Sequence, residues 1–179
     1  MIKIKELIPV YPEDMLKKRV AQMGEQIAAD YPQGELICVC VLKGAVFFFT
    51  DLVREIGRHR QGVMIDFLRA SSYADGMSSS CNVKITKDVD LDVKDKHVLF
   101  IEDVIDSGFT MSKVIPMFKE RGAKSVKLAA LIDKRERREV KIDIDYSGFV
   151  LERGFIVGYG HDLAEKYREL TGIYEAVVE

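Results

Sequence analysis

The segment VLFIEDVIDSGFT, residues 98–110, joins a run of apolar residues to an acidic turn. Its apolar start predicts a strand buried on both faces, and its end predicts the first turn of a helix. Two adjacent carboxylates, Glu102 and Asp103, stand where that strand ends, and Asp106 follows them. Gly108 permits a tight turn, and the free N–H groups at a helix start bind anions. The segment therefore predicts a strand–turn–helix unit with an anion site in its turn.

Strand-like and helix-like segments alternate along the rest of the chain. Apolar residues at helical spacing predict helices over 12–30, 45–57 (closed by Gly57), 110–122 and 162–170. Short apolar or alternating runs predict strands over 36–42, 63–71, 82–89, 97–103 and 125–133, with shorter pieces over 142–150 and 154–160. This alternation indicates an α/β fold with a mostly parallel central sheet flanked by helices. We expect a single domain that spans residues 1–179.

Composition restricts the class of protein. The chain has 47% apolar and 31% charged residues and a formal net charge of −2, which argues against binding to nucleic acid. No apolar run approaches the roughly 20 residues of a membrane span, and the N-terminus lacks the pattern of a signal peptide. The three cysteines, Cys38, Cys40 and Cys81, are expected to be reduced thiols in the cytoplasm. Cys38 and Cys40 should lie on the same face of a strand as core residues rather than as metal ligands.

The turn after residue 105 points to a ligand that contains both phosphate and ribose. The hydroxyls of Ser107 and Thr110 could donate to phosphate oxygens, although a plain helix cap uses the same residue types. The carboxylates of Glu102 and Asp103 favour a ligand, because they would accept hydrogen bonds from sugar hydroxyls and attract a metal ion. The pattern is neither G-x-G-x-x-G nor G-x-x-x-x-G-K-[ST], which disfavours a dinucleotide-binding fold and a P-loop.

The 98–110 segment resembles the phosphoribosyl-pyrophosphate (PRPP) signature of type I phosphoribosyltransferases. Within that family the chain is similar to the hypoxanthine-guanine phosphoribosyltransferases over nearly its whole length. The matching segments are LKGA (42–45), SSY (71–73), DKRERR (133–138), DYSGF (145–149), GFIVGYG-x-D (154–162) and AEKYR (164–168). The resemblance implies the type I phosphoribosyltransferase fold, with a small hood formed by the N- and C-terminal segments.

The resemblance also implies roles for the residues of the acidic segment. Glu102 and Asp103 would meet the ribose hydroxyls, and Asp106 would be the general base near purine N7. The 5′-phosphate would be held by the loop made of Asp106, Ser107, Gly108, Phe109 and Thr110. Mg²⁺ would be the cofactor, with Glu102, Asp103 and Asp162 as its ligands.

Other segments would bind the purine and the pyrophosphate. Lys134 would donate to O6 of the base, Phe155 would stack on the ring, and Ile156 and Asp162 would contact the base edge. Pyrophosphate would be held by Lys43, Gly44 and Arg168, next to a cis peptide at Leu42–Lys43. Ser72 and Tyr73 would belong to a lid over 71–81. From the residues alone, Lys134 could equally be a solvated lysine, Phe155 a core residue and Asp162 a helix cap.

The expected activity is the transfer of 5-phosphoribosyl from PRPP to hypoxanthine or guanine, which gives IMP or GMP and pyrophosphate. A homodimer or homotetramer is expected by resemblance. Two alternatives stay open: a nucleotide-binding regulator on the same fold and a partner subunit without catalysis. The chain departs from the family at His161, where a leucine is usual, and at Leu163, where a tyrosine is usual. We expect His161 to alter the preference for the base or the pH dependence.

Overall fold

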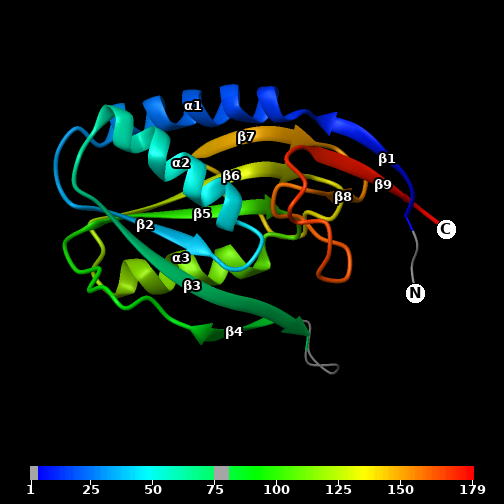
Figure 1. Cartoon of the computed structure of the whole chain (residues 1–179). Helices are drawn as coiled ribbons and strands as arrows, with labels where there is room; N and C mark the ends of the chain where they lie inside the picture. The colour runs from blue at the N-terminus through cyan, green and yellow to red at the C-terminus, as the bar shows by residue number, and fades with distance from the viewer. Residues whose placement is uncertain (1–3, 75–80) are drawn as a thin grey trace.

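The computed structural model describes residues 4–74 and 81–179, with the backbone alone for 71–74 and 81–82. Its centre is a six-stranded sheet in the order β4-β3-β2-β5-β6-β7 (Figure 1). The strands are β2 (Leu36–Val41), β3 (Val63–Ala74), β4 (Cys81–Lys87), β5 (His97–Ile105), β6 (Ser125–Lys134) and β7 (Tyr146–Leu151). All neighbours in this sheet are parallel except β3 and β4, which confirms the predicted mostly parallel sheet.

Helices cover both faces of the sheet. The helices α1 (Glu13–Asp30) and α2 (Val46–His59) lie on one face, and α3 (Phe109–Glu120) lies on the other (Figure 1). Alternate residues of the buried strand β2 contribute to the two resulting cores: Cys38 packs with α1 and α2, whereas Val39 packs with α3. This arrangement explains why β2 is apolar throughout, since neither face of the strand meets water.

Cys38 and Cys40 lie on the same face of β2, as predicted, and both are free and fully buried thiols. Burial raises the pKa of each thiol to about 12, so the thiolates needed for metal binding are disfavoured. Their role as small core residues is therefore confirmed.

A second, antiparallel sheet forms the hood in the order β1-β9-β8. It consists of β1 (Ile4–Tyr11), β8 (Ile156–Val157) and β9 (Ile173–Val178), so the two ends of the chain lie side by side (Figure 1). The hood contacts β7 through Tyr11, whose ring stacks on Phe149 with centroids 4.2 Å apart. The expected hood of terminal segments is thus confirmed, although β1 and β9 were not predicted as strands.

One predicted helix is absent, and the predicted end of another helix is wrong. Residues 162–170 form no helix: backbone bonds join Tyr159 to Leu170 and Gly160 to Arg168, so the chain folds back on itself. Left-handed backbone angles at Ala164, Glu165 and Tyr167 are incompatible with a helix there. In α2, Gly57 does not end the helix, which continues to His59. Within the described ranges, no helix has the length and apolar character to cross a membrane.

Candidate active site

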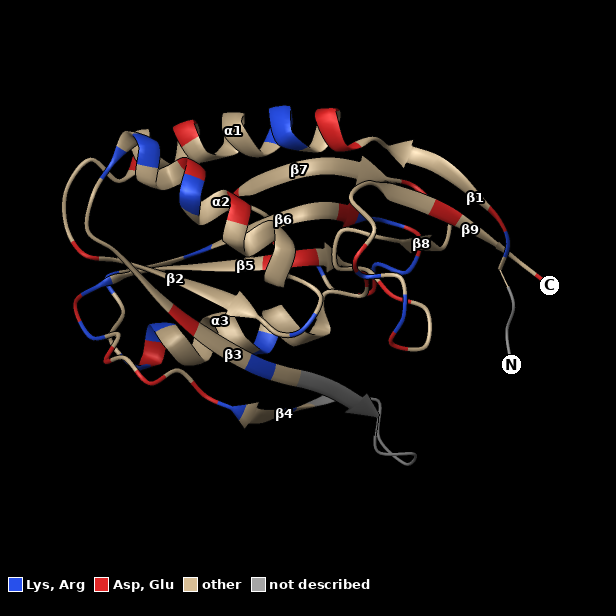
Figure 2. Ribbon diagram, viewed as in Figure 1, with Lys and Arg blue, Asp and Glu red and all other residues tan. Residues whose placement is uncertain are grey.

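The acidic pair lies inside β5, which continues past it to Ile105 (Figure 2). Burial, and then repulsion by the neighbouring Asp103 carboxylate, raise the pKa of Glu102 well above its usual value. The Asp103 carboxylate also lies against the loop after β2, because a Cβ on Gly44 in that loop would overlap it. The absence of a side chain at Gly44 therefore lets this loop approach the acidic pair.

The turn after β5 lines a pocket of about 140 Å³, called here the turn pocket. Gly108, with φ +86°, is the residue before α3, and the hydroxyl of Ser107 accepts a bond from the N–H of Phe109 at 3.4 Å. Ser107 thus bonds to the first residue of α3, although the N-cap residue itself is Gly108 and makes no side-chain cap bond. The residues lining the pocket are Glu102, Val104, Ile105, Asp106, Ser107, Gly108, Thr110 and Met111.

A second pocket of about 180 Å³, called here the base pocket, lies between β5, the end of β6 and the hood. It brings together the four residues predicted to contact the purine. Lys134 is 9% exposed and Phe155 is 45% exposed, so the lysine is the more buried of the two, and its ammonium lies 3.6 Å from Oε2 of Glu136. The lining residues are Asp103, Val104, Asp106, Lys134, Phe155, Ile156, His161 and Asp162.

Asp106 and Val104 line both pockets, so the pockets meet at these residues. The Oδ1 atom of Asp106 is buried and has no hydrogen-bond partner among the described residues. A buried carboxylate oxygen without a partner is costly unless a ligand supplies a donor. Asp106 therefore lies where a base in one pocket and a sugar phosphate in the other would come together.

The residues predicted for pyrophosphate form an ionic cluster. Lys43 follows the cis peptide Leu42–Lys43, and its Nζ lies 2.6 Å from Oε2 of Glu165. Arg168 lies 3.5 Å from the same oxygen and 2.8 Å from Oδ1 of Asp162. Asp162 also accepts a bond from the N–H of Glu165 at 2.8 Å, so it stabilises this loop rather than capping a helix. An adjacent hollow of about 360 Å³ is lined by Leu42, Lys43, Arg69, Ala70 and Thr86.

The three predicted metal ligands do not converge into one site. In the part of the chain that the structure describes, no three His, Cys, Asp or Glu side chains form a metal-binding group. The pair of Glu102 and Asp103 still suits a divalent cation, because two adjacent carboxylates repel each other and a cation would relieve that repulsion. Mg²⁺ commonly uses one or two carboxylates and completes its shell with substrate oxygens and water.

Sequence reasoning missed the role of Arg138. The residue is half-buried, and it donates to the carbonyl oxygens of Ile105 and Asp106 and to the carboxylate of Asp133. Its neighbour Arg137 is exposed to solvent. No periodicity distinguishes the two arginines in the sequence, because the segment is irregular in structure.

The predicted lid falls at the margin of what the structure describes. Ser72 and Tyr73 belong to β3, which pairs with β4 beside them. The predicted lid, 71–81, therefore contains strand at both ends, and residues 75–80 and the side chains of Ser72 and Tyr73 lie outside the described part.

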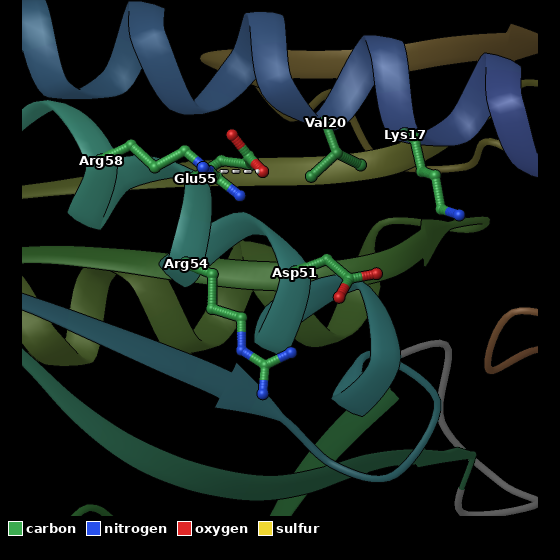
Figure 3. A pocket seen from close by; sticks show the side chains of 6 residues that line it. All are labelled: Lys17, Val20, Asp51, Arg54, Glu55 and Arg58. Carbon is green, nitrogen blue, oxygen red and sulfur yellow. Dashed lines mark hydrogen bonds and ion pairs between the residues drawn. The ribbon is translucent and has the colours of Figure 1, made fainter.

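A further hollow of about 330 Å³ lies between α1 and α2 (Figure 3). Its lining carries both signs of charge, and Arg58 forms an ion pair with Glu55 at 3.1 Å. It shares no lining residue with the turn pocket or the base pocket. Its residues are Lys17, Val20, Asp51, Arg54, Glu55 and Arg58.

Residues 11–164 match the family model described as a phosphoribosyl transferase domain. The chain therefore belongs to the phosphoribosyltransferases, and the expected family fold is confirmed. The hypoxanthine phosphoribosyltransferase of Escherichia coli K12 is 41% identical, over 93% of this chain and 93% of that protein. The hypoxanthine-guanine phosphoribosyltransferase of Streptococcus pneumoniae is 43% identical, over 89% of this chain and 87% of that protein. Within the class, the chain belongs to the hypoxanthine-guanine phosphoribosyltransferase family.

Solved structures agree with this assignment. A crystal structure of a hypoxanthine-guanine phosphoribosyltransferase from Bacillus anthracis is 38% identical, with a TM-score of 0.88 and coverage of 99% of this chain and 100% of that chain. A bifunctional TilS/HprT protein of Listeria innocua is 46% identical over 90% of this chain, which spans only 24% of that longer protein.

Proposed function

We propose that the protein transfers the 5-phosphoribosyl group from PRPP to hypoxanthine or guanine, giving IMP or GMP and pyrophosphate. One observation carries this proposal: the turn pocket and the base pocket meet at Asp106. Names of relatives that cover nearly the whole chain support it. Adenine offers an amino group at position 6 where Lys134 needs an acceptor, so it is expected to be a poor substrate.

In the reaction, the bond from the anomeric carbon to pyrophosphate breaks and a bond to the purine nitrogen forms. As this bond forms, the proton on purine N7 would pass to the carboxylate of Asp106, which lies at the junction of the pockets. General-base help of this kind is typically worth about 10²–10⁴-fold in rate. Lys134 would donate to O6, and Phe155 would stack on the ring.

Lys43, Gly44 and Arg168 would bind the leaving pyrophosphate, while Glu102 and Asp103 would accept from the ribose hydroxyls. When bound, Mg²⁺ would neutralise the charge of the pyrophosphate and make it a better leaving group. Glu102 and Asp103 are the proposed protein ligands, and Asp162 would orient Arg168 through their 2.8 Å ion pair. A single domain, a cytoplasmic location and a homodimer or homotetramer remain part of the proposal.

The test is a spectrophotometric assay with PRPP and Mg²⁺ that offers hypoxanthine, guanine, xanthine and adenine in parallel. Turnover of hypoxanthine or guanine that stops on addition of EDTA is expected. Asp106→Asn should lower kcat by about 10²–10⁴-fold. Binding of IMP without turnover of any base would contradict the proposal and favour a regulator or a non-catalytic subunit.

A further inference from the structure

The segment after β6 packs directly against the turn that would hold the 5′-phosphate. We propose that Arg138 is a positioning residue, which orients the amide groups of this turn toward the phosphate. Its Nε donates to the carbonyl oxygen of Asp106 at 2.8 Å, and its Nη2 donates to that of Ile105 at 2.9 Å. The same Nη2 lies 2.6 Å from the carboxylate of Asp133, which fixes the guanidinium.

The main chain beyond Arg138 continues this contact. The N–H groups of Glu139 and Val140 both donate to the carbonyl oxygen of Ser107 at 3.1 Å. Consecutive carbonyl groups of the turn, from Ile105 to Ser107, are thus all held by residues 138–140. Residues 138–140 therefore fix the backbone of the turn.

The orientation of the amides follows from peptide geometry. The C=O and N–H of a trans peptide unit point in opposite directions. Because residues 138–140 hold the carbonyls of Asp106 and Ser107, the N–H groups of Ser107 and Gly108 are directed away from this segment. Successive N–H groups that point the same way form an anion-binding nest, and a left-handed residue such as Gly108, with φ +86°, is typical of one.

Gly108 is also required for the contact itself. A Cβ on this residue would lie 3.0 Å from the carbonyl oxygen of Val140, closer than a side chain normally packs. The glycine therefore allows the 138–140 segment to reach the turn.

Arginine suits this position better than lysine does. Its planar guanidinium serves several acceptors at once, whereas the ammonium of lysine is a single point with shorter reach. Arg138 does not line the turn pocket, and its positive charge, bonded to the carbonyl groups of the turn, would attract a bound phosphate. Arg137, which is exposed, provides a matched control.

This inference rests on the proposed function only for the identity of the ligand, a sugar 5′-phosphate. The first experiment measures binding of ribose 5-phosphate, IMP and pyrophosphate by calorimetry to the wild type and three variants: Arg138→Met, Arg138→Lys and Arg137→Met. Arg138→Met should weaken ribose 5-phosphate and IMP by about tenfold or more, the worth of one charge-assisted hydrogen bond. Arg138→Lys should recover part of this loss, and Arg137→Met should match the wild type. Pyrophosphate affinity should stay unchanged, because Lys43 and Arg168 lie in a different cluster.

A spectroscopic signature separates positioning from a general structural role. With ¹⁵N-glycine labelling, ribose 5-phosphate should shift the amide signal of Gly108 in the wild type and in Arg137→Met, and not in Arg138→Met. If Arg138→Met does not fold, as judged by thermal unfolding, the same comparison is made with Arg138→Lys. There, a raised KM for PRPP with a nearly unchanged kcat is expected.

Equal affinity of Arg138→Met and the wild type for ribose 5-phosphate would overturn the inference. So would an equal loss for ribose 5-phosphate and pyrophosphate, since that pattern reports general damage. If the wild type binds ribose 5-phosphate through Gly108 but transfers nothing to any base, the proposed function fails while the role of Arg138 stands.

Discussion

Lys43 and Glu165, which are 122 positions apart in the sequence, form an ion pair with 2.6 Å between Nζ and Oε2. Arg168 shares the same carboxylate oxygen. The hydrogen bond from Lys43, followed by the charges of Lys43 and Arg168, lowers the pKa of Glu165. One acidic side chain therefore joins the two cations that are proposed to hold pyrophosphate, and it would compete with pyrophosphate for them.

Removal of this competitor should tighten pyrophosphate binding. Glu165→Gln is expected to lower the Kd of pyrophosphate by about twofold to fivefold, since an exposed ion pair is only a weak competitor for the two cations. The gain should shrink at high ionic strength. Calorimetry at two salt concentrations measures it, and Glu169→Gln, on an exposed neighbour, should have no effect. Weaker binding by Glu165→Gln would show that Glu165 assists pyrophosphate instead of competing with it.

Glu102 is expected to lower stability at neutral pH. Burial and the adjacent Asp103 raise the pKa of Glu102 above the usual 4.5. The folded protein therefore binds the proton of this carboxyl group more tightly than the unfolded chain does. The resulting stabilisation is fully present below pH 4.5 and is lost as pH rises through the raised pKa. At pH 7.5, Glu102→Gln should therefore raise Tm, by about 2–4 °C for each kcal/mol relieved, while it lowers activity.

Thermal unfolding between acidic and neutral pH measures this effect. The curves of Tm against pH for the wild type and for Glu102→Gln should converge near pH 4, where Glu102 of the wild type is protonated in both the folded and the unfolded state. Glu25→Gln, at an exposed position within α1, serves as the control and should leave Tm unchanged at every pH. A Tm difference that is independent of pH would contradict the assigned charge repulsion.

Gly160 should not tolerate a side chain. Its φ is +103°, and a Cβ would overlap the carbonyl oxygen of Gly44, next to the proposed pyrophosphate site. Gly160→Ala is expected to destabilise the protein by about 1–3 kcal/mol from backbone strain alone and to raise the KM for PRPP. Gly57→Ala is the control: it lies in α2 with open space around it, and it should stabilise by about 0.5–1 kcal/mol. Urea unfolding measures the change in unfolding free energy, which should fall for Gly160→Ala and rise for Gly57→Ala.

His161 should influence the choice of base. Its side chain is 5% exposed and lines the base pocket, with Nδ1 3.0 Å from the carbonyl oxygen of Gly158 and Nε2 4.0 Å from the Asp103 carboxylate. His161→Leu should change the ratio of kcat/KM for hypoxanthine and guanine, or the pH profile of either. His59→Leu, at the exposed end of α2, is the control. An unchanged ratio together with an unchanged pH profile would remove His161 from base selection.

Local patterns in the sequence determined the central architecture. Apolar runs at strand spacing predicted β2, β5 and β6, since a strand buried on both faces must be apolar along its length. The acidic residues near the end of β5 predicted a ligand, because carboxylates in a buried strand are costly without a partner. The family signature then assigned residues to each part of the proposed ligand.

Only the tertiary structure decided how distant segments complete the site. β1 pairs with β9 from the other end of the chain. Residues 162–170 have the apolar spacing of a helix, but they form contacts with Gly160 and with Lys43 instead. Arg138 is one of several similar arginines in the sequence, and only the fold brings it into contact with the turn. These features depend on contacts between residues far apart in the sequence, whose gains outweigh local propensity, and no local pattern encodes them.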